Sequence, residues 1–463
     1  MTLFGTAGIR GDVRETVTPE LAMAVGRAAA IEAATGDTPP TFVVARDGRE
    51  TGQALVAAMT AGLTSGGANV LQADELPTPA LAFATRDRRG VMMTASHNPP
   101  HDNGIKLFQD GVEYDTAAED RIEAQVKDSP SPTPWDRWGS VRSIEPLDRY
   151  REAVCTYAQE FGTPLDELSI VVDCGNGMAS VATPAVLRQL GADVIALNAN
   201  VDGHFPGRAS KPTPESLTDL RAFVADRAVD LGIAHDGDAD RIVVVDATGD
   251  VVHEDTVLAI LAEAYVRASQ AADPVVVTTP NASGRIDERV EAANGRTTRV
   301  RLGALHEGIA DVETDADSGT QVVFAAEPWK HIHPAFGGWI DGVASAAVFS
   351  RLVADAGDIA ALRAPVAERP YRKLSIDCPD TQKEPAMSII AERLPEAFPD
   401  GDIDTEYGVR IDRPDGSWVL VRPSGTEPYI RIYVESDSID EMVEAARAVV
   451  EGAVDAAQGM PMG

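Results

Sequence analysis

Four short stretches of the chain hold residue types that could do chemistry. The first, GVMMTASHNPPHDNGIKLF, runs from Gly90 to Phe108, and its apolar residues 91–94 predict a buried strand that ends just before Ser96. Chemistry in α/β sheets gathers at the carboxyl ends of strands, so Ser96 is a candidate nucleophile. Neighbours in extended chain point to opposite faces, which would place His97 poorly for activating Ser96, and there is no G-x-S-x-G elbow. A turn capped by the serine hydroxyl is the alternative for this stretch alone.

The second stretch, DGDADR, brings three carboxylates into one short loop. Asp236, Asp238 and Asp240 lie between the apolar runs LGIA and IVVVD, which predict flanking strands. Carboxylates held this close repel one another unless a cation neutralises them, and oxygen ligands favour Mg²⁺, Mn²⁺ or Ca²⁺. An EF-hand is excluded, because Arg241 stands at its sixth position and Ala247 at its twelfth. We therefore expect a metal loop here.

The third stretch, RPSGTEPYIR, combines hydroxyls, a glycine and arginines. Ser424, Gly425 and Thr426 can turn hydroxyl and backbone N–H groups toward one point, and Arg422 and Arg431 flank them. Such a turn is typical of a phosphate nest, although a plain β-turn fits the local sequence equally well.

The fourth stretch, FGTAGIRG over residues 4–11, is glycine-rich and carries Arg10. By itself it fits a tight turn as well as a binding loop.

The elements that must position these loops follow one recurring order. Strand, short turn, helix and strand are predicted at 41–72, 169–197 and 274–302, which indicates three α/β domains in tandem with parallel or mixed sheets. After Pro365, strands are predicted at 371–377, 407–424 and 430–436, with a hairpin turn at 414–416 and a final helix at about 440–457, typical of a smaller α+β domain. We expect domain boundaries at 1–145, 146–251, 252–365 and 366–463, with a Pro/Ser-rich stretch from Asp128 near the first.

Composition limits the class of protein. A chain of 463 residues is too long for one core, and it contains no apolar run long enough to span a bilayer and no secretory signal. The net charge of −33 argues against nucleic acid and anionic lipid as partners. An acidic, lysine-poor surface leads to the hypothesis of adaptation to high salt, where self-repulsion is screened. Three distant cysteines indicate buried thiols in a reducing cytoplasm.

Taken together, the motifs resemble the α-D-phosphohexomutase family, which includes phosphoglucomutases, phosphomannomutases and phosphoglucosamine mutases. The resemblance extends over essentially the whole chain, in order: FGTAGIRG, ARDGRETG, TASHNPPHDNGIK, VDCGNG, DGHFPG, DGDADR and RPSGTEP. It implies four domains around a central cleft, in order the phosphoserine, metal, sugar-recognition and phosphate-binding domains. It also implies a cytoplasmic enzyme, monomeric or homodimeric, that interconverts hexose 6-phosphate and hexose 1-phosphate through a bisphosphosugar.

The resemblance also implies roles for single residues. Ser96 would carry the phosphoryl group and share one Mg²⁺ per chain with the three aspartates, and hexose 1,6-bisphosphate would activate the enzyme. Arg10 and Lys106 would serve the reacting phosphoryl and proton transfer, and Arg241 would support that site. His97 completes the group of candidate catalytic residues. The distal phosphate would be held by the fourth-domain loop: Arg422, Ser424, Gly425, Thr426 and Arg431.

The third-domain loop departs from the family pattern. In AAEPWKHIHP, Glu327 and His331 keep their places as sugar contacts, but Trp329 replaces a usual serine and Lys330 a usual glycine. The indole could stack on a sugar face, narrow the pocket or pack under the loop. Glucosamine, mannose and glucose phosphates all remain open as substrates.

Two other function classes compete with a mutase. A metal-dependent sugar-phosphate phosphatase would use the same serine, but it would not need a second phosphate-binding loop. A sugar-phosphate sensor on the same scaffold would require a lost catalytic residue, and none is missing from the four stretches.

Overall fold

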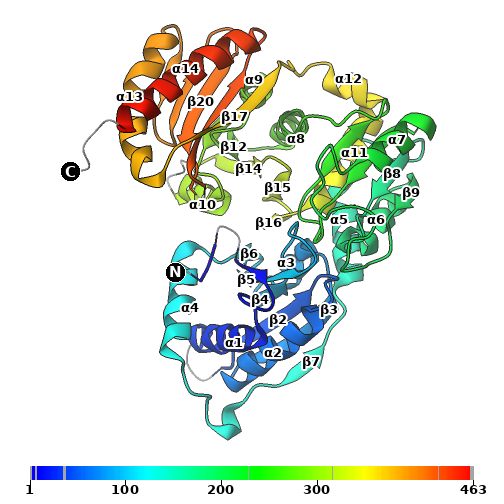
Figure 1. The fold of residues 1–463 in the computed structure, drawn as a ribbon. Coiled ribbons are helices and arrows are strands. Elements are labelled where there is room, and N and C mark those ends of the chain that lie inside the picture. Colours follow the sequence, from blue (N-terminus) through cyan, green and yellow to red (C-terminus); the bar gives the residue numbers. More distant parts are fainter. Residues whose placement is uncertain are drawn as a thin grey trace. The chain divides into compact units, whose positions relative to one another are not determined.

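The computed structural model describes residues 3–5, 8–34, 38–227, 229–314, 316, 318–425 and 427–458 (Figure 1). The chain forms two compact units, one of Met1–Val257 with Val323–Arg363 and one of Leu258–Val322 with Ala364–Gly463. Helix α8 (Glu254–Ala268) and strand β14 (Thr320–Glu327) contain two of the points where the chain passes from one unit to the other. The units are described separately below.

The first sheet of unit 1 holds the serine stretch. Its strands follow the order β1-β5-β4-β2-β3-β7, with β6 paired to β5. Pairs β2–β3, β2–β4 and β3–β7 are parallel, whereas β1–β5, β4–β5 and β5–β6 are antiparallel, so the sheet is mixed. The strands are β1 (Ile9–Asp12), β2 (Thr41–Arg46), β3 (Asn69–Glu75), β4 (Arg89–Met93), β5 (Asp102–Gln109), β6 (Val112–Glu113) and β7 (Val141–Ser143).

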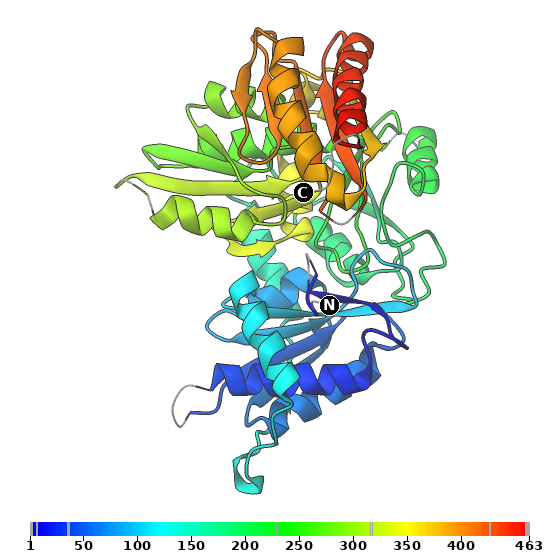
Figure 2. The ribbon, with the colours of Figure 1, turned by 60° about the vertical axis from the view of Figure 1, so that its left-hand side comes forward.

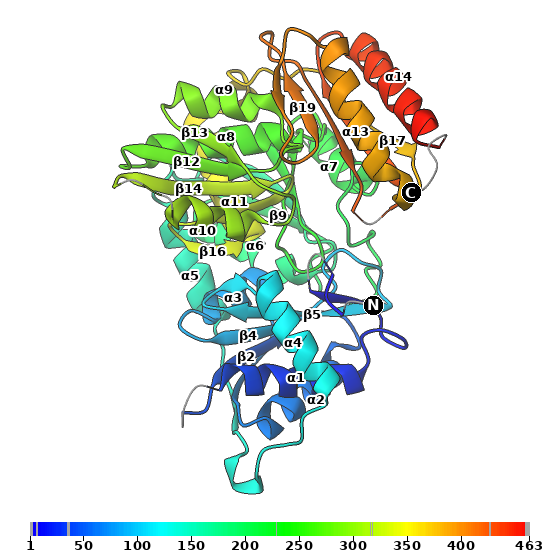
Figure 3. The ribbon, with the colours of Figure 1, turned by 90° about the vertical axis from the view of Figure 1, so that its left-hand side faces the viewer.

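Helices cover both faces of this sheet. Helices α1 (Pro19–Ala33) and α2 (Gly52–Ser65) pack on one face and α3 (Thr78–Ala84) on the other, while α4 (Thr116–Asp128) lies against α1 (Figure 3). Thr18 caps α1 by accepting a hydrogen bond from the Leu21 N–H at 3.3 Å. Helix α2 ends at Gly66, and Gly67 takes φ +97°, as expected from the glycine pair in the sequence. A short 3₁₀ turn, η1 (Trp135–Arg137), precedes β7.

The second sheet of unit 1 holds the aspartate loop. Its order is β11-β10-β8-β9, with β8 parallel to β9 and β10, and β11 antiparallel to β10. The aspartates lie between β10 and β11, which confirms the predicted loop between two buried strands. The elements are α5 (Leu147–Ala158), β8 (Ser169–Asp173), η2 (Met178–Val181), α6 (Thr183–Gln189), β9 (Asp193–Leu197), α7 (Thr218–Arg227), β10 (Leu231–Ala234) and β11 (Val243–Asp246).

Unit 1 is completed by a short antiparallel meander and two helices. Strand β15 (Lys330–His333) pairs with the end of β14 and with β16 (Gly337–Ile340). Helix α11 (Gly342–Ala356) follows and is buried over most of its surface, and α12 (Ile359–Arg363) ends the unit. Asp341 caps α11 through its Oδ1, which accepts a hydrogen bond from the Ala344 N–H at 2.8 Å.

Unit 2 contains the predicted C-terminal sheet. Its strands follow the order β17-β21-β20-β19-β18, and all pairs are antiparallel. Helices α13 and α14, orange and red in Figure 2, lie side by side on one face of this sheet. The C-terminal elements are β17 (Tyr371–Asp377), α13 (Asp380–Ala397), β18 (Asp402–Asp404), β19 (Val409–Asp412), β20 (Trp418–Pro423), β21 (Tyr429–Glu435) and α14 (Ile439–Gln458). The other elements are β12 (Asp273–Thr278), α9 (Gly284–Ala292), β13 (Arg296–Arg299) and α10 (Leu305–Thr314).

The predicted fold class is confirmed: α/β units with mixed sheets precede a smaller α+β part. The hairpin through 414–416 joins β19 to β20, and the last helix begins and ends within a residue of its expected bounds. All three cysteines are free and buried, as expected. Among the described residues, none of the helices is both long and apolar enough to cross a bilayer. The boundaries at 145, 251 and 365 stay predictions.

Candidate active site

Ser96 lies buried at the carboxyl end of β4 in an unusual backbone conformation. Its φ is +51°, a left-handed value that a serine adopts only when its surroundings hold it there. The Ser96 N–H donates to the Thr94 Oγ1 at 2.9 Å, so the predicted hydroxyl-capped turn exists, but Thr94 caps it. The loop therefore has a fixed shape, and the Ser96 hydroxyl is left for other contacts.

A buried ion pair holds that shape. Arg49 donates to the carbonyl oxygens of Ser96, Asn98 and Asp102 at 2.8–2.9 Å, and also to that of Pro99. Its Nε donates to the Asp47 Oδ2 at 3.0 Å, and neither charged side chain is more than 1% exposed. One guanidinium thus binds four carbonyls of the serine loop at once.

The Ser96 hydroxyl contacts both an aspartate and a histidine. Its Oγ donates to the Asp236 Oδ2 at 2.7 Å, and the His97 Nδ1 lies 3.4 Å from the same oxygen. The expectation that His97 would point away was wrong, because it assumed extended chain and Ser96 has a positive φ. Burial, followed by the charges of Arg241 and Arg10, lowers the pKa of His97 to about 3, so its ring is neutral.

The three aspartates form the cluster that the sequence predicts. One oxygen each from Asp236, Asp238 and Asp240 lies within 4.8 Å of the others, and all three residues are buried. Within the part of the chain that the structure describes, the Oδ1 atoms of Asp238 and Asp240 have no hydrogen-bond partner. Burial, then the charges of Asp240 and Asp238, raises the pKa of Asp236. Buried carboxylate oxygens that lack a hydrogen-bond partner among the described residues, in a group of this size, fit a divalent cation with oxygen ligands.

The metal loop is held against the serine loop by close backbone contact. A side chain at Gly237 would place its Cβ 2.5 Å from the Ser96 carbonyl oxygen, so only glycine fits. Thr78 donates from its Oγ1 to the Asp238 Oδ2 at 2.7 Å, and its N–H donates to the Asp238 carbonyl at 3.0 Å. Arg208 donates to the His235 carbonyl at 2.7 Å and pairs with Asp173, which fixes the start of the loop.

Basic side chains surround the cluster. The Lys106 Nζ lies 2.9 Å from Glu113, 3.3 Å from Asp240 and 3.9 Å from Asp238. Burial opposes its charge, but Glu113 and Asp240 outweigh burial and raise the pKa of Lys106, so it stays protonated. The Arg241 Nε lies 3.6 Å from Asp236 and 3.8 Å from Asp240.

Arg10 lies on β1, where it pairs with Gly104 of β5. Its charge acts on His97, Lys106 and Asp240. Arg10 therefore belongs to the same electrostatic neighbourhood as Ser96, as the sequence predicts for a residue serving the reacting phosphoryl.

The β14–β15 hairpin lies against the metal loop. Glu327 pairs with Lys330 across a two-residue turn, and Trp329 takes φ +69°, a value typical of the second central residue of a type II turn. The Trp329 carbonyl accepts from the Ile242 N–H at 3.1 Å, and Lys330 forms a β-bridge with Arg241. The hairpin is therefore hydrogen-bonded to the segment that directly follows the aspartates.

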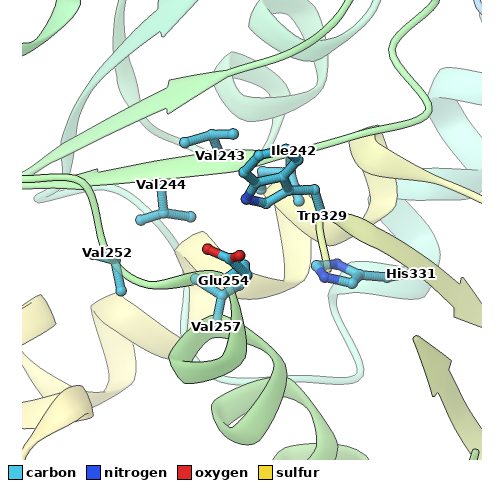
Figure 4. Close-up of a pocket in the computed structure, with 8 residues that line it drawn as sticks. All are labelled: Ile242, Val243, Val244, Val252, Glu254, Val257, Trp329 and His331. Atoms are coloured by element: carbon cyan, nitrogen blue, oxygen red, sulfur yellow. The ribbon is translucent and has the colours of Figure 1, made fainter. Parts of the chain in front are cut away.

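Of the three possibilities for the Trp329 indole, packing under the loop is the one that the structure supports. It contacts the core cluster of the second sheet and lines a small hollow with Glu254 and His331 (Figure 4). The other residues lining this hollow are Ile242, Val243, Val244, Val252 and Val257. Partial burial of the indole helps to stabilise a backbone conformation that tryptophan rarely adopts.

His331 is also buried, with 1% of its surface exposed. Its Nδ1 lies 3.0 Å from the Ser345 Oγ, and the His333 Nε2 lies 2.9 Å from the same oxygen. Because Ser345 donates its hydroxyl hydrogen to the Asp341 carbonyl at 2.7 Å, both imidazoles donate to the serine oxygen. Burial lowers the pKa of His331 to about 3 and that of His333 to about 4.

The phosphate-nest stretch lies in unit 2, between β20 and β21. The Ser424 N–H donates to the Tyr429 carbonyl at 2.9 Å, and the Ser424 Oγ accepts from the Glu427 N–H at 3.2 Å. Lys383 of α13 donates to the carbonyls of Ser424 and Glu427 at 2.6 and 2.7 Å. Thr426 lies outside the described residues.

Groups suited to an anion flank this turn. Arg422 donates to the Tyr433 hydroxyl at 3.0 Å, and Arg431 donates to Glu427 at 2.8 Å. Among the described residues, the Nε atoms of both arginines lack a hydrogen-bond partner, and a Cβ at Gly425 would meet no atom within 4 Å. The turn thus offers open space beside two guanidinium groups.

Sequence reasoning passed over the residues that hold the loops. Arg49 and Asp47 lie within the ARDGRETG motif, but the motif alone indicates no role for either. Nothing in the local sequence distinguishes Glu113 or Lys383. For Asp47 and Arg49, the sequence offers one indication of a structural role: two opposite charges, two residues apart, directly after a predicted buried strand. No signal linked Lys383 to the turn, because 41 residues separate it from Ser424.

Comparison with known proteins agrees with the motifs. Family models described as phosphoglucomutase/phosphomannomutase match residues 1–132 (α/β/α domain I), 148–249 (α/β/α domain II) and 375–452 (C-terminal domain). The chain is 40% identical to a phosphopentomutase of Thermococcus kodakarensis over 99% of this chain and 100% of that protein. It is 41% identical to a probable phosphoglucosamine mutase of Methanopyrus kandleri, covering 97% and 98% of the two chains.

Solved structures share the fold. A phosphoglucomutase/phosphomannomutase family protein from Burkholderia thailandensis superposes with a TM-score of 0.82 at 24% identity, covering 100% of this chain and 99% of that one.

Proposed function

Because the chain belongs to the α-D-phosphohexomutase family of isomerases, we propose that it interconverts hexose 6-phosphate and hexose 1-phosphate through a phosphoserine at Ser96. The proposal is supported above all by the contact between the Ser96 hydroxyl and Asp236, within a ring of fixed positive charge. Phosphoryl transfer needs little covalent chemistry beyond positioning and charge stabilisation, and this site supplies both.

Three basic residues, Lys106, Arg10 and Arg241, would stabilise the negative charge of the transferring phosphoryl group. Lys106, held protonated by Glu113 and Asp240, would bind an oxygen of the transferring group. Arg10 and Arg241 would add charge from either side of the cluster.

His97 is suited to move the proton. When Ser96 attacks a bisphosphosugar, its Oγ forms a bond to phosphorus while the bond between phosphorus and the sugar oxygen breaks, so the serine hydroxyl loses a hydrogen and the departing sugar oxygen gains one. The neutral His97 Nδ1, 3.4 Å from the Ser96 Oγ, would accept the serine hydrogen, and the protonated Lys106 would supply a proton to the departing sugar oxygen; both transfers reverse when phosphoserine donates its phosphoryl group.

The aspartates would hold one Mg²⁺ together with an oxygen of phosphoserine. The partnerless Oδ1 atoms of Asp238 and Asp240 fit this role. When bound, the ion would neutralise negative charge that develops on the transferring group.

The second phosphate of the substrate requires a separate site. We assign it to the turn of Arg422, Ser424, Gly425 and Arg431, where backbone and guanidinium groups flank open space. Hexose 1,6-bisphosphate would then phosphorylate Ser96 and activate the enzyme. Glu327 would contact sugar hydroxyls, while His331 would orient the hairpin from the interior through Ser345.

A ³¹P NMR assay tests this function. Protein with Mg²⁺ and a trace of hexose 1,6-bisphosphate is offered a hexose 6-phosphate, and a hexose 1-phosphate resonance is expected to grow until equilibrium. Growth of inorganic phosphate alone would instead establish the phosphatase alternative. The Ser96→Ala variant is the matched control and should produce neither.

A further inference from the structure

Lys330 forms an ion pair with Glu327, the residue of the β14–β15 hairpin that we propose contacts the sugar. The Lys330 Nζ lies 2.8 Å from the Glu327 Oε1, and the two side chains are only 20% and 14% exposed. A pair this well sheltered from water interacts more strongly than an exposed one. Glu327 is therefore engaged by a cation of the protein itself.

The pair lies at the edge of the catalytic cluster, within one compact unit. Lys330 forms a β-bridge with Arg241, whose guanidinium lies 3.6 Å from Asp236 and 3.8 Å from Asp240. Lys330 therefore adds a cation beside Arg241, next to the aspartate cluster. Lys330 thus contributes to the field that a bound sugar would meet.

The turn that carries Lys330 is anchored on both sides. The Trp329 carbonyl accepts a hydrogen bond from the Ile242 N–H, and its partly buried indole packs against the core of the second sheet. The left-handed backbone of Trp329 directs the chain so that residue 330 returns opposite Glu327. The ion pair is therefore a fixed feature of the hairpin, which is what a specificity element requires.

We propose that Lys330 is a specificity-determining residue that selects phosphosugars with uncharged ring substituents against those bearing an ammonium group. This inference rests on the proposed mutase function. An amino sugar placed at Glu327 would find its carboxylate already paired and would bring its positive charge close to Lys330. A hydroxyl in the same position can accept a hydrogen bond from Lys330 and donate one to Glu327, so it is not penalised.

The test compares substrates in one assay. kcat/KM is measured with glucose 6-phosphate, mannose 6-phosphate, ribose 5-phosphate and glucosamine 6-phosphate for the unmodified protein and for Lys330→Met, which keeps the side-chain length without its charge. The unmodified protein should favour an uncharged sugar. Lys330→Met should shift the ratio toward glucosamine 6-phosphate by about tenfold or more, because Glu327 then becomes available to the ammonium.

Two variants make the result interpretable. Lys330→Arg keeps the charge and should keep the discrimination. Lys127→Met removes a lysine that pairs with Glu123 at 2.6 Å, remote from this hairpin, and should leave the ratio unchanged. A preference of the unmodified protein for glucosamine 6-phosphate, an unchanged ratio in Lys330→Met, or an equal loss for every sugar would each overturn the inference. Failure to isomerise any of the sugars would instead overturn the proposed function.

Discussion

Arg49 donates a hydrogen bond to the carbonyl oxygen of Ser96 at 2.9 Å, although 47 residues separate them in the chain. The same guanidinium binds three further carbonyls of the serine loop and the carboxylate of Asp47. A buried charge thus sets the backbone conformation of the proposed nucleophile. The arrangement makes the loop rigid only while both charges are present.

Arg49→Met should destabilise the protein by about 3–5 kcal/mol, because it leaves the Asp47 carboxylate buried without its partner. Urea unfolding followed by circular dichroism measures this loss. Arg46→Met is the matched control: Arg46 pairs with Asp74 and Glu75, which are 76% and 41% exposed, so its loss should be about 0–1 kcal/mol. Equal losses for the two variants would show that burial of the Arg49 pair has no particular importance.

Asp238→Asn should weaken divalent-cation binding by about tenfold or more, because it removes charge from an oxygen that has no protein partner. Isothermal titration with Mg²⁺ or Mn²⁺ measures the affinity. Asp250→Asn, at an aspartate that is 74% exposed, should bind the ion as the unmodified protein does. Unchanged affinity in Asp238→Asn would place the cation elsewhere.

Lys383→Met should raise KM for a sugar phosphate several-fold while changing kcat less, because Lys383 holds the carbonyls of the proposed distal-phosphate turn. Steady-state kinetics separate the two parameters, with Lys127→Met as a control on another helix. A fall in kcat at constant KM would instead connect Lys383 to the chemical step.

The protein should lose stability as pH falls from about 6.5 toward 4. Burial lowers the pKa of His333 to about 4 in the folded chain, whereas the unfolded chain binds that proton near pH 6.5. The unfolded state therefore gains protons first, and its free energy falls relative to the folded state. Urea midpoints at pH 7.5, 6 and 5 measure the trend, and His333→Gln should make it shallower. Midpoints that do not change with pH would contradict a buried neutral imidazole.

The sequence was informative about strand ends and loops because those depend on neighbouring residues. Short continuous apolar runs placed Ser96 after β4 and the aspartates between β10 and β11. A pair of glycines indicated where helix α2 ends. The positive φ of Ser96 was not predictable, because it results from carbonyl contacts with Arg49 in another βα turn. His97 was misplaced for the same reason.

The role of Trp329 depends on tertiary contacts as well. Its position in the motif allowed stacking on a sugar, but the partly buried indole packs against the core of the second sheet, and the Trp329 carbonyl is bonded to Ile242. The local sequence around Trp329 does not indicate which distant residues lie beneath the turn. The same holds for Lys330, whose effect on Glu327 depends on the register of the β14–β15 hairpin.

The most direct test of the account is whether Ser96 carries the phosphoryl group that moves. The protein is incubated with glucose 1,6-bisphosphate. Phosphopeptides are then mapped by tandem mass spectrometry before and after a chase with excess hexose 6-phosphate. We expect phosphate on Ser96, its transfer to the sugar during the chase, and a loss of turnover of about a thousandfold or more in Ser96→Ala with the fold unchanged. Turnover that persists in Ser96→Ala, or phosphate found only on another residue, would contradict the account.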